Sequence, residues 1–499
     1  MKNITIISIG IVLLLGSSCK KITEGINVDP NRPTDVGTRY DLLINGAELS
    51  ATLLNEGSLA RLGGMYSRTF TGSDRQYTSL YNYEITAGEF DDNWDRLYGI
   101  VIANSAVTIT KATALNDKTS TGIAQVIQAM AFGLAADLWG DVPFKEAGDP
   151  DKFPTPHFDA QASVYAGVQT LLSNAIANLS ANVGAGPGAK DFFYRGSRTK
   201  WLAAAYTLKA RFYLHTKEYD NAVTNAMLGI SSATNNMVAP HGPSYLSSFN
   251  VYYSFLTYDR SAYMNASISY AADLLNPSKP TYRGNIKTDE GDRFNYLFQE
   301  GLNTSDLDPN VLVDFDWGVP TSWNGFFGAT TSFPLVSFEE NKLILAEAYI
   351  KSATQDPINA LSALNSVRGY FNAGGGSTTS GSTVSTSTYY TGFGKVYLPY
   401  LIADFLPGGI KNALTSGQTQ NQALLKEILT ERYVTFIGQI EQFNDVRRTK
   451  NYLGIPAVKG TKLPQRFLYA QSEINTNPNT PAVSSTDLFK ETPVNTTPY

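Results

Sequence analysis

The chain has 499 residues, of which 42% are hydrophobic and 17% are charged, and its net charge at pH 7 is −5. This length and apolar content allow a sizeable core, whereas the mild acidity and the scattered Lys and Arg residues argue against nucleic-acid binding, which needs a basic face. The chain contains a single cysteine, which excludes a framework of disulfides within the chain.

The N-terminus has the pattern of a lipoprotein signal peptide. Lys2 precedes an apolar run over residues 4–15, which suits a signal-peptide core but is shorter than the roughly 20 residues of a membrane span. Small residues at 16–18 then directly precede Cys19, as in a lipobox, where cleavage leaves an acylated cysteine carrying diacylglyceryl and palmitate-type chains. We expect a signal peptide over residues 1–18, a lipid anchor at Cys19 and a polar tether over residues 19–38. The alternative is an ordinary secretory signal followed by a stray cysteine.

Helical periodicity dominates the rest of the chain. Residues 199–230 and 337–368 each read as a helix–turn–helix pair. Each pair places alanines twelve positions apart across its turn: Ala210 with Ala222, and Ala348 with Ala360. Small residues at these positions let antiparallel helices approach closely, as tetratricopeptide repeats require.

Two further helix pairs are predicted in the N-terminal half. Residues 121–138 pair with residues 161–180, and residues 40–60 pair with residues 93–112. The spacing between these pairs is irregular, so they would be degenerate repeats. A plain helical bundle is the alternative.

We expect a single domain over residues 39–499 that is mostly α, with tetratricopeptide-like helix pairs as its scaffold. Its parts are the helical scaffold at about 40–231, 335–370 and 421–450, a loop-rich ligand lobe with short strands at about 232–334, a flexible insertion at 371–420 with low-complexity sequence at 373–394, and a closing segment at 451–499.

The sequence carries no recognisable catalytic motif. His157, His215 and His241 are far apart and follow no metal-ligand spacing, and His215 ends an amphipathic helix, which favours a structural role. We therefore predict that the protein is not an enzyme and that it has no catalytic residue, cofactor or metal ligand. The competing interpretation is a surface glycosidase that uses one of three acid pairs: Asp91/Asp92, Asp314/Asp316 or Glu339/Glu340.

Several segments resemble motifs of the SusD/RagB family of outer-membrane lipoproteins, in the same order along the chain. They are "DPNRPT" (29–34), "LAADLWGDVPFKEA" (134–147), "FPLVSFEENKLILAEAYIK" (333–351), "ILTERYVTFIGQIEQFNDVRRT" (428–449) and "RFLYAQSEINTNPN" (466–479). The resemblance runs from Cys19 to beyond Asn477 and covers essentially the whole mature chain. Within these motifs, residues 137–141 are expected to end a helix in a tight turn at Gly140. Residues 444–448 are expected to form a buried polar network that locks the C-terminal segment.

The resemblance implies a SusD-like fold and a protein that captures substrate for a SusC-like, TonB-dependent transporter. Such proteins are anchored by their N-terminal lipid in the outer membrane of Gram-negative bacteria, facing the cell surface. They bind oligosaccharides, or peptides in some members, and deliver them to the barrel beneath. A free-standing structural or adhesion lipoprotein without a transporter is the alternative.

Aromatic residues in loops are the candidates for ligand contacts, because sugars stack on aromatic faces while flanking polar groups bond their hydroxyls. Trp317 and Trp323 lie in the loop "DFDWGVPTSWNGFFG", where Asp316 and Asn324 supply polar groups. The stretch "TFTGSDRQYTSLYNYE" adds a second set: Asp74, Arg75, Tyr77, Tyr81 and Tyr83. The alternative is that these rings pack under one another or against the transporter. Residues Trp94, Trp139 and Trp201 are predicted to lie in the core.

Overall fold

Helices make up most of the regular structure of the protein, which a computed structural model describes over residues 39–244, 247–300, 306–311, 325–373, 377–380, 383–386, 396–482 and 484–499. Residues 41–499 form one compact unit. The α-helices are α3 (Tyr40–Glu56), α4 (Ser58–Tyr66), α5 (Arg75–Tyr81), α6 (Asp91–Asp95), α7 (Ala103–Ala114), α8 (Lys118–Trp139), α9 (Gln161–Ser180), α10 (Arg198–His215), α11 (Tyr219–Ala226), α12 (Val251–Ser254), α13 (Tyr270–Leu275), α14 (Gly291–Leu297), α15 (Phe338–Lys351), α16 (Pro357–Asn372), α17 (Gln420–Thr435), α18 (Ile440–Arg448) and α19 (Gln471–Thr476). The predicted mostly-α fold class is confirmed.

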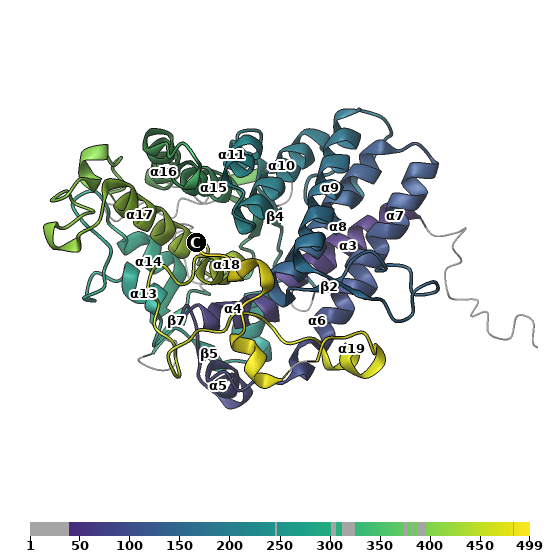
Figure 1. Cartoon of the computed structure of the whole chain (residues 1–499), viewed down its shortest axis with the longest axis horizontal. Coiled ribbons are helices and arrows are strands. Elements are labelled where there is room, and N and C mark those ends of the chain that lie inside the picture. The colour runs from purple at the N-terminus through teal and green to yellow at the C-terminus, as the bar shows by residue number, and fades with distance from the viewer. Residues whose placement is uncertain are drawn as a thin grey trace, which may run out of the picture. The chain divides into compact units, whose positions relative to one another are not determined.

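Helix α8 lies at the centre of the N-terminal half (Figure 1). Its first turn is capped by Asp117, whose carboxylate accepts a hydrogen bond of 3.1 Å from the backbone N–H of Ser120. Helices α7, α9 and α10 pack around α8. Among the described helices, α8 has the length and apolar composition of a membrane span. Its apolar stretch is, however, entirely buried inside the fold. It is therefore a core helix of this unit.

The predicted helix pairs are present as α8 with α9, α10 with α11, and α15 with α16. The four alanines expected at the close approaches of the latter two pairs are fully buried. Helix α11 also packs on α15, so that the two pairs stack, as Figure 1 shows. The predicted fourth pair is less regular. Its second half is divided into α6, the π-helical turn η2 (Arg96–Ile102) and α7. Helix α3 approaches α7 at Gly46, where a Cβ atom would lie 3.3 Å from Asn104 Nδ2.

Short strands pair in two-stranded antiparallel sheets between the helices. The pairs are β1 (Thr71–Gly72) with β5 (Met264–Asn265), β2 (Val142–Pro143) with β3 (Phe158–Asp159), β4 (Met237–Ala239) with β8 (Phe333–Val336), β6 (Phe298–Glu300) with β7 (Leu307–Pro309), and β9 (Ser377–Ser380) with β10 (Thr383–Thr386). Strands β4 to β7 and the start of β8 lie in the segment expected to be loop-rich. They join distant parts of the chain, since β1 pairs with a strand about 190 residues further on.

The segment from 396 to 418, expected within a flexible insertion, is closed by specific hydrogen bonds. Asn412 donates from its side chain to the carbonyls of Phe405 (2.9 Å) and Gln418 (3.0 Å). Arg368 of α16 donates to the carbonyl of Leu398 at 2.8 Å, and its guanidinium lies 3.8 Å from the ring centroid of Tyr400. These contacts fasten the segment to α16.

Candidate functional site

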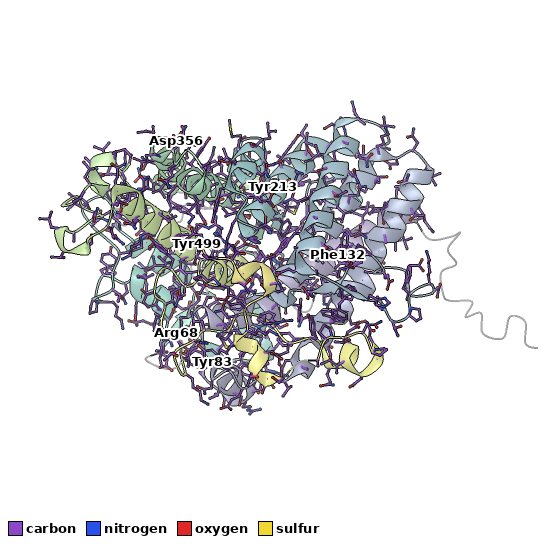
Figure 2. The ribbon with its side chains drawn as sticks, in the orientation of Figure 1. Arg68, Tyr83, Phe132, Tyr213, Asp356 and Tyr499 are labelled. Carbon is purple, nitrogen blue, oxygen red and sulfur yellow. The ribbon has the colours of Figure 1, made fainter. Side chains whose placement is uncertain are left out.

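Five of the residues predicted to bind ligand lie on or beside α5, and the structure separates them into two kinds. Asp74 and Arg75 are exposed, and Asp74 caps α5 by accepting a hydrogen bond from the backbone N–H of Arg75 at 2.9 Å. The rings of Tyr77, Tyr81 and Tyr83 are buried; Figure 2 labels Tyr83 in this region. The charged pair is therefore open to a ligand, whereas the three rings belong mainly to the core beneath it.

The buried tyrosines are held by contacts within the protein. The hydroxyl of Tyr77 accepts a hydrogen bond from Arg61 at 3.2 Å, and its ring centroid lies 5.0 Å from that of Phe255. The hydroxyl of Tyr83 accepts from the backbone N–H of Val458 at 2.9 Å. The sequence pattern predicts a loop for these rings, whereas residues 75–81 form a helix that turns Tyr77 and Tyr81 inward.

The other four predicted ligand residues, Asp316, Trp317, Trp323 and Asn324, lie outside the described residues. The described residues nearest to them in sequence are Val311, two positions after β7, and Gly325. Strand β7 is joined to the α5 region, because the backbone N–H of Ala266, next to β5, donates to the carbonyl of Leu307 at 2.7 Å. Strand β5 in turn pairs with β1, which directly precedes α5.

A group of aromatic residues that the sequence did not single out lies in the run 249–263, where Tyr258 is exposed and Phe249, Tyr253 and Tyr263 are half-buried. Tyr263 receives the guanidinium of Arg75 at 5.6 Å from its ring centroid. The rings of Phe249 and Tyr258 are stacked at 5.9 Å, and Tyr253 lies 5.0 Å from Phe249. We call Phe249, Tyr253, Tyr258 and Tyr263 the aromatic patch.

The signal for the aromatic patch is present in the sequence as the tyrosine-rich run "FNVYYSFLTYDRSAY" (249–263). Helix α12 and the π-helical turn η5 (Phe255–Asp259) sort its rings into two sets. Tyr252 and Phe255 turn into the core, whereas Tyr258 remains 51% exposed. Aromatic density alone does not reveal which rings face outward, because that depends on the helical geometry.

A second feature is a cavity of about 610 Å³ between α6, η2, the loop 143–156 and α19. Trp94 and Tyr98 line it, but their polar atoms are already bonded, to Glu473 at 3.1 Å and to the carbonyl of Pro143 at 3.0 Å. Its carboxylates are Asp91, Asp92, Asp95, Glu146 and Glu473. The cavity offers many hydrogen-bond acceptors to a ligand.

The three acid pairs considered for a glycosidase are in different settings. Asp91 and Asp92 line the cavity just described. Glu340 is buried and bonds Arg211 through both oxygens at 2.5 and 2.7 Å, which gives it a structural role. Asp314 and Asp316 lie outside the described residues. In the cavity, hydrogen bonds from the backbone and side chain of His157 lower the pKa of Glu146, so this carboxyl is poorly suited to act as a general acid.

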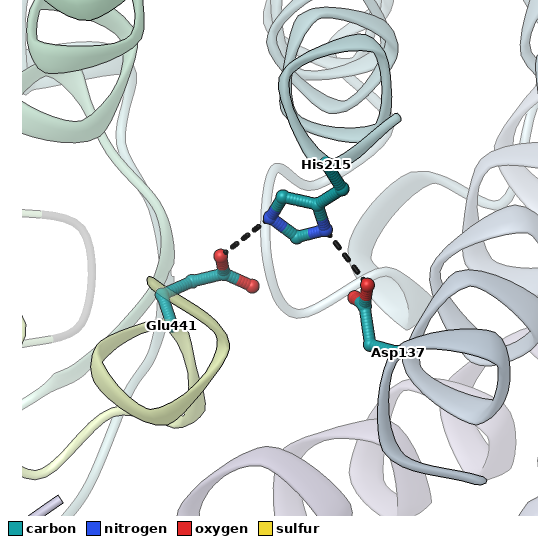
Figure 3. Close-up of side chains that lie close together, drawn as sticks. All are labelled: Asp137, His215 and Glu441. Atoms are coloured by element: carbon teal, nitrogen blue, oxygen red, sulfur yellow. Dashed lines mark hydrogen bonds and ion pairs between the residues drawn. The ribbon is translucent and has the colours of Figure 1, made fainter. Parts of the chain in front are cut away.

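A buried triad of Asp137, His215 and Glu441 joins three helices, α8, α10 and α18 (Figure 3). Asp137 Oδ1 lies 2.7 Å from His215 Nδ1, and Glu441 Oε2 lies 3.1 Å from His215 Nε2. Burial by itself lowers the pKa of His215, but the two carboxylates outweigh it and raise the pKa to about 9. The imidazole is therefore doubly protonated at neutral pH and donates to both carboxylates.

The spacing of these three side chains would also suit a metal ion, but their hydrogen bonds favour a different role. A histidine that ligates a metal must have lost the proton from the ligating nitrogen. Asp137 Oδ1 also accepts from the hydroxyl of Tyr165 at 2.5 Å, and Glu441 Oε1 accepts from Asn444 at 3.1 Å. The imidazolium thus supplies the positive charge that a metal ion would otherwise bring to the two carboxylates. The triad joins helices distant in sequence, in agreement with the structural role predicted for His215.

The predicted network of residues 444–448 surrounds this triad. Arg447 donates to the carbonyls of Asp137 at 2.8 Å and Gln465 at 2.9 Å, so that it ties α18 to both α8 and the C-terminal segment. Arg448 bonds Glu347 of α15 at 2.5 Å. Gly140 ends α8 with a φ of +85°, as the tight turn requires. The family motifs are therefore determinants of the fold.

Comparisons with known proteins agree with this architecture. The profile of a SusD-like family, described as "Starch-binding associating with outer membrane", matches residues 30–349. A SusD/RagB family protein from Bacteroides thetaiotaomicron has a similar structure, with a TM-score of 0.64 at 19% identity, covering 91% of this chain and 97% of that one. A chitin-binding SusD homolog from Flavobacterium johnsoniae gives a TM-score of 0.60 at 16% identity, over 87% and 93% of the two chains. No curated protein matches the sequence.

Proposed function

The chain belongs to the SusD-like family, and from that premise we propose that it is a nutrient-binding lipoprotein of the outer membrane that captures oligosaccharides. The observation that carries the proposal is the family match over residues 30–349, whose description names starch binding and the outer membrane. The chitin-binding homolog with the same fold supports a glycan as the ligand. We propose binding without turnover, since the buried triad and network described above serve the fold.

We place the ligand on the aromatic patch, together with Asp74 and Arg75. The patch offers rings to the C–H face of a sugar, and the two charged residues stand beside Tyr263 to bond hydroxyls. Residues 316, 317, 323 and 324 stay part of the proposed ligand surface. The buried Tyr77, Tyr81 and Tyr83 would support this surface from below.

The test is a glycan and peptide array followed by calorimetry with the ligand that it identifies. We expect Tyr258→Ala to weaken binding at least about tenfold, equivalent to about 1.4 kcal/mol, because it removes the most exposed ring of the patch. Tyr206→Ala, on half-buried α10 surface, is the matched control. If the Tyr258→Ala protein folds and binds with unchanged affinity, the ligand site does not lie on the aromatic patch. If the ligand identified is a peptide, the proposal of a glycan ligand is wrong.

We further propose that the protein passes its ligand to a SusC-like, TonB-dependent transporter. Apolar side chains exposed in and beside the 396–418 segment support a protein partner, since such patches mark interaction surfaces. Ile286 is 82% exposed, Leu401 60% and Leu414 78%. Co-purification in mild detergent should recover a barrel protein, and Leu401→Ser with Leu414→Ser should weaken that recovery. Reproducible failure to recover any barrel from the native host would count against the transporter.

The anchor at Cys19 lies outside the described residues and is likewise proposed. Cys19→Ala should release the protein from the membrane fraction without unfolding it, because the substitution removes the acyl chains and leaves the compact unit intact. Fractionation and circular dichroism measure both effects. Intact-mass analysis that finds an unmodified thiol at Cys19 in the native host would contradict this assignment.

A further inference from the structure

A second cavity, of about 450 Å³, lies between α13, α17 and the loop 410–418, and we call it the α13–α17 cavity. Its volume is in the range of about 300–1,000 Å³ that small-ligand sites occupy. It is lined by Tyr270, Leu274, Thr281, Arg283, Ile410, Lys411, Ala413, Ser416, Gln418, Ala423, Lys426, Glu427, Thr430 and Leu453. None of these residues belongs to the aromatic patch or to the buried triad.

One face of α17 forms a wall of this cavity. Ala423, Lys426, Glu427 and Thr430 follow one another at i, i+3, i+4 and i+7, which places them along the same side of a helix. Glu427 is buried, whereas Lys426 is exposed. The wall therefore carries a lysine at its solvent edge and a carboxylate in its depth.

Arg283 lies in the depth of the cavity, where it is only 7% exposed. Its Nη2 bonds Glu427 and Glu431, both at 2.7 Å. Its Nη1 lies 3.3 Å from Glu290 without forming a hydrogen bond, and within the described residues neither Nε nor Nη1 has an acceptor. The guanidinium is thus enclosed by three carboxylates, and its Nε and Nη1 atoms are shielded from solvent, so that Arg283 supports the α17 wall from within.

Among the charged side chains that line the cavity in the described chain, only Lys426 is left without a counter-charge, because Arg283 pairs with Glu290, Glu427 and Glu431. Three cations, Arg283, Lys411 and Lys426, line it together with one carboxylate, that of Glu427. Lys411 is paired with Glu427 at 2.6 Å. Over the part of the chain that the structure describes, the Lys426 ammonium has no partner. It therefore remains available to an oxyanion that enters the cavity.

Neutral groups around the cavity suit the rest of a sugar. The Tyr270 hydroxyl, the Gln418 side-chain amide and the Thr281 hydroxyl line it, and none of the three is hydrogen-bonded within the described ranges. Leu274 and Leu453 supply apolar surface. The combination of free hydroxyl and amide groups with a cation is what a polar ring bearing one negative charge requires.

We propose that the α13–α17 cavity binds an acidic saccharide, with the carboxylate or sulfate of the sugar held by Lys426 at the solvent edge of the cavity. This assignment rests on the proposed function and adds a ligand class and a second site to it. Tyr270 and Gln418 bond the sugar hydroxyls. The aromatic patch would bind the neutral part of a glycan, so that the two sites recognise different chemistry.

The test uses three probes on the full-length protein: galacturonate, galactose and inorganic sulfate, each titrated by calorimetry at low salt. We expect galacturonate to bind in preference to the other two, with an affinity that falls as salt is added. Lys426→Gln should weaken galacturonate binding roughly three- to tenfold, because it removes a charged hydrogen bond at the rim. Lys462→Gln, which removes the same charge from an exposed surface position, is the matched control and should change nothing.

Tyr270→Phe provides a second variant that loses only a hydroxyl. Arg283 is unsuitable for substitution, because its removal would leave Glu427 and Glu431 buried without a cation. Absence of galacturonate binding, or binding that neither Lys426→Gln nor Tyr270→Phe weakens, would overturn the proposal. If sulfate binds as tightly as galacturonate, the cavity is a site for a simple anion and the saccharide assignment is wrong. The ligand site given under the proposed function is tested independently by Tyr258→Ala. If that variant leaves glycan affinity unchanged while Lys426→Gln weakens galacturonate binding, the aromatic patch is not the glycan site and the α13–α17 cavity assignment stands.

Discussion

Replacing His215 with Gln is expected to destabilise the protein by about 3–5 kcal/mol at neutral pH. The imidazolium lies between two buried carboxylates, at 2.7 Å from Asp137 and 3.1 Å from Glu441. Gln fills most of the same space but carries no charge, so both carboxylates would face each other in the core. Removing one partner of a buried ion pair costs more than the pair contributes, because the remaining charge stays desolvated.

The pH dependence gives a second, independent measure of the same interaction. The pKa of His215 is about 9 in the folded protein and 6.5 in its ordinary state. A difference of this size contributes about 3 kcal/mol of stability. Because the folded pKa is the higher one, the contribution is complete below about pH 6.5 and is lost as the pH rises through about 9. The His215→Gln variant has no imidazole to titrate and should therefore not show this loss of stability.

Urea unfolding followed by circular dichroism at about pH 6 and about pH 10 measures both effects. Tyr and Lys residues also titrate over this interval, so the informative quantity is the difference between the wild type and the variant. His157→Gln is the matched control, since that side chain is 76% exposed and its ion pair with Glu146 is at the surface. The reasoning is refuted if the wild type and the His215→Gln variant lose equal stability between the two pH values.

Two further predictions concern packing and charge, and both are read from unfolding free energies. Gly133→Ala should destabilise the protein by about 1–3 kcal/mol, because the added Cβ atom would lie 2.0 Å from Phe212 Cζ. Gly369→Ala adds a Cβ atom with nothing within 4 Å and should stabilise the protein by about 0.5–1 kcal/mol. Equal effects of the two glycine variants would contradict the close approach of α8 and α10. Arg448→Met should cost about 3–5 kcal/mol, because its partners are buried, whereas Lys459→Met breaks an exposed pair and should cost less than about 1 kcal/mol. A loss below about 1 kcal/mol for Arg448→Met would show that its buried ion pairs do not support the fold.

Local patterns in the sequence were sufficient for the helical scaffold. The 3.6-residue periodicity and the alanines of α10, α11, α15 and α16 predicted these helices and their close approaches, because burial on one helical face leaves a regular trace in the sequence. The tight turn at Gly140 and the network of residues 444–448 were predicted through the family resemblance.

The surface roles of the aromatic residues were decided by the tertiary structure. Tyr77 and Tyr258 are the same residue type in similarly polar stretches, yet one is buried against Phe255 and the other is 51% exposed. The cavity around Arg283 likewise combines residues from α13, α17 and the loop before α17, more than 140 positions apart. Sequence determined which residues can form helices and cores, because those signals are local. Exposure and cavities depend on which distant segments meet, and that information exists only in the folded chain.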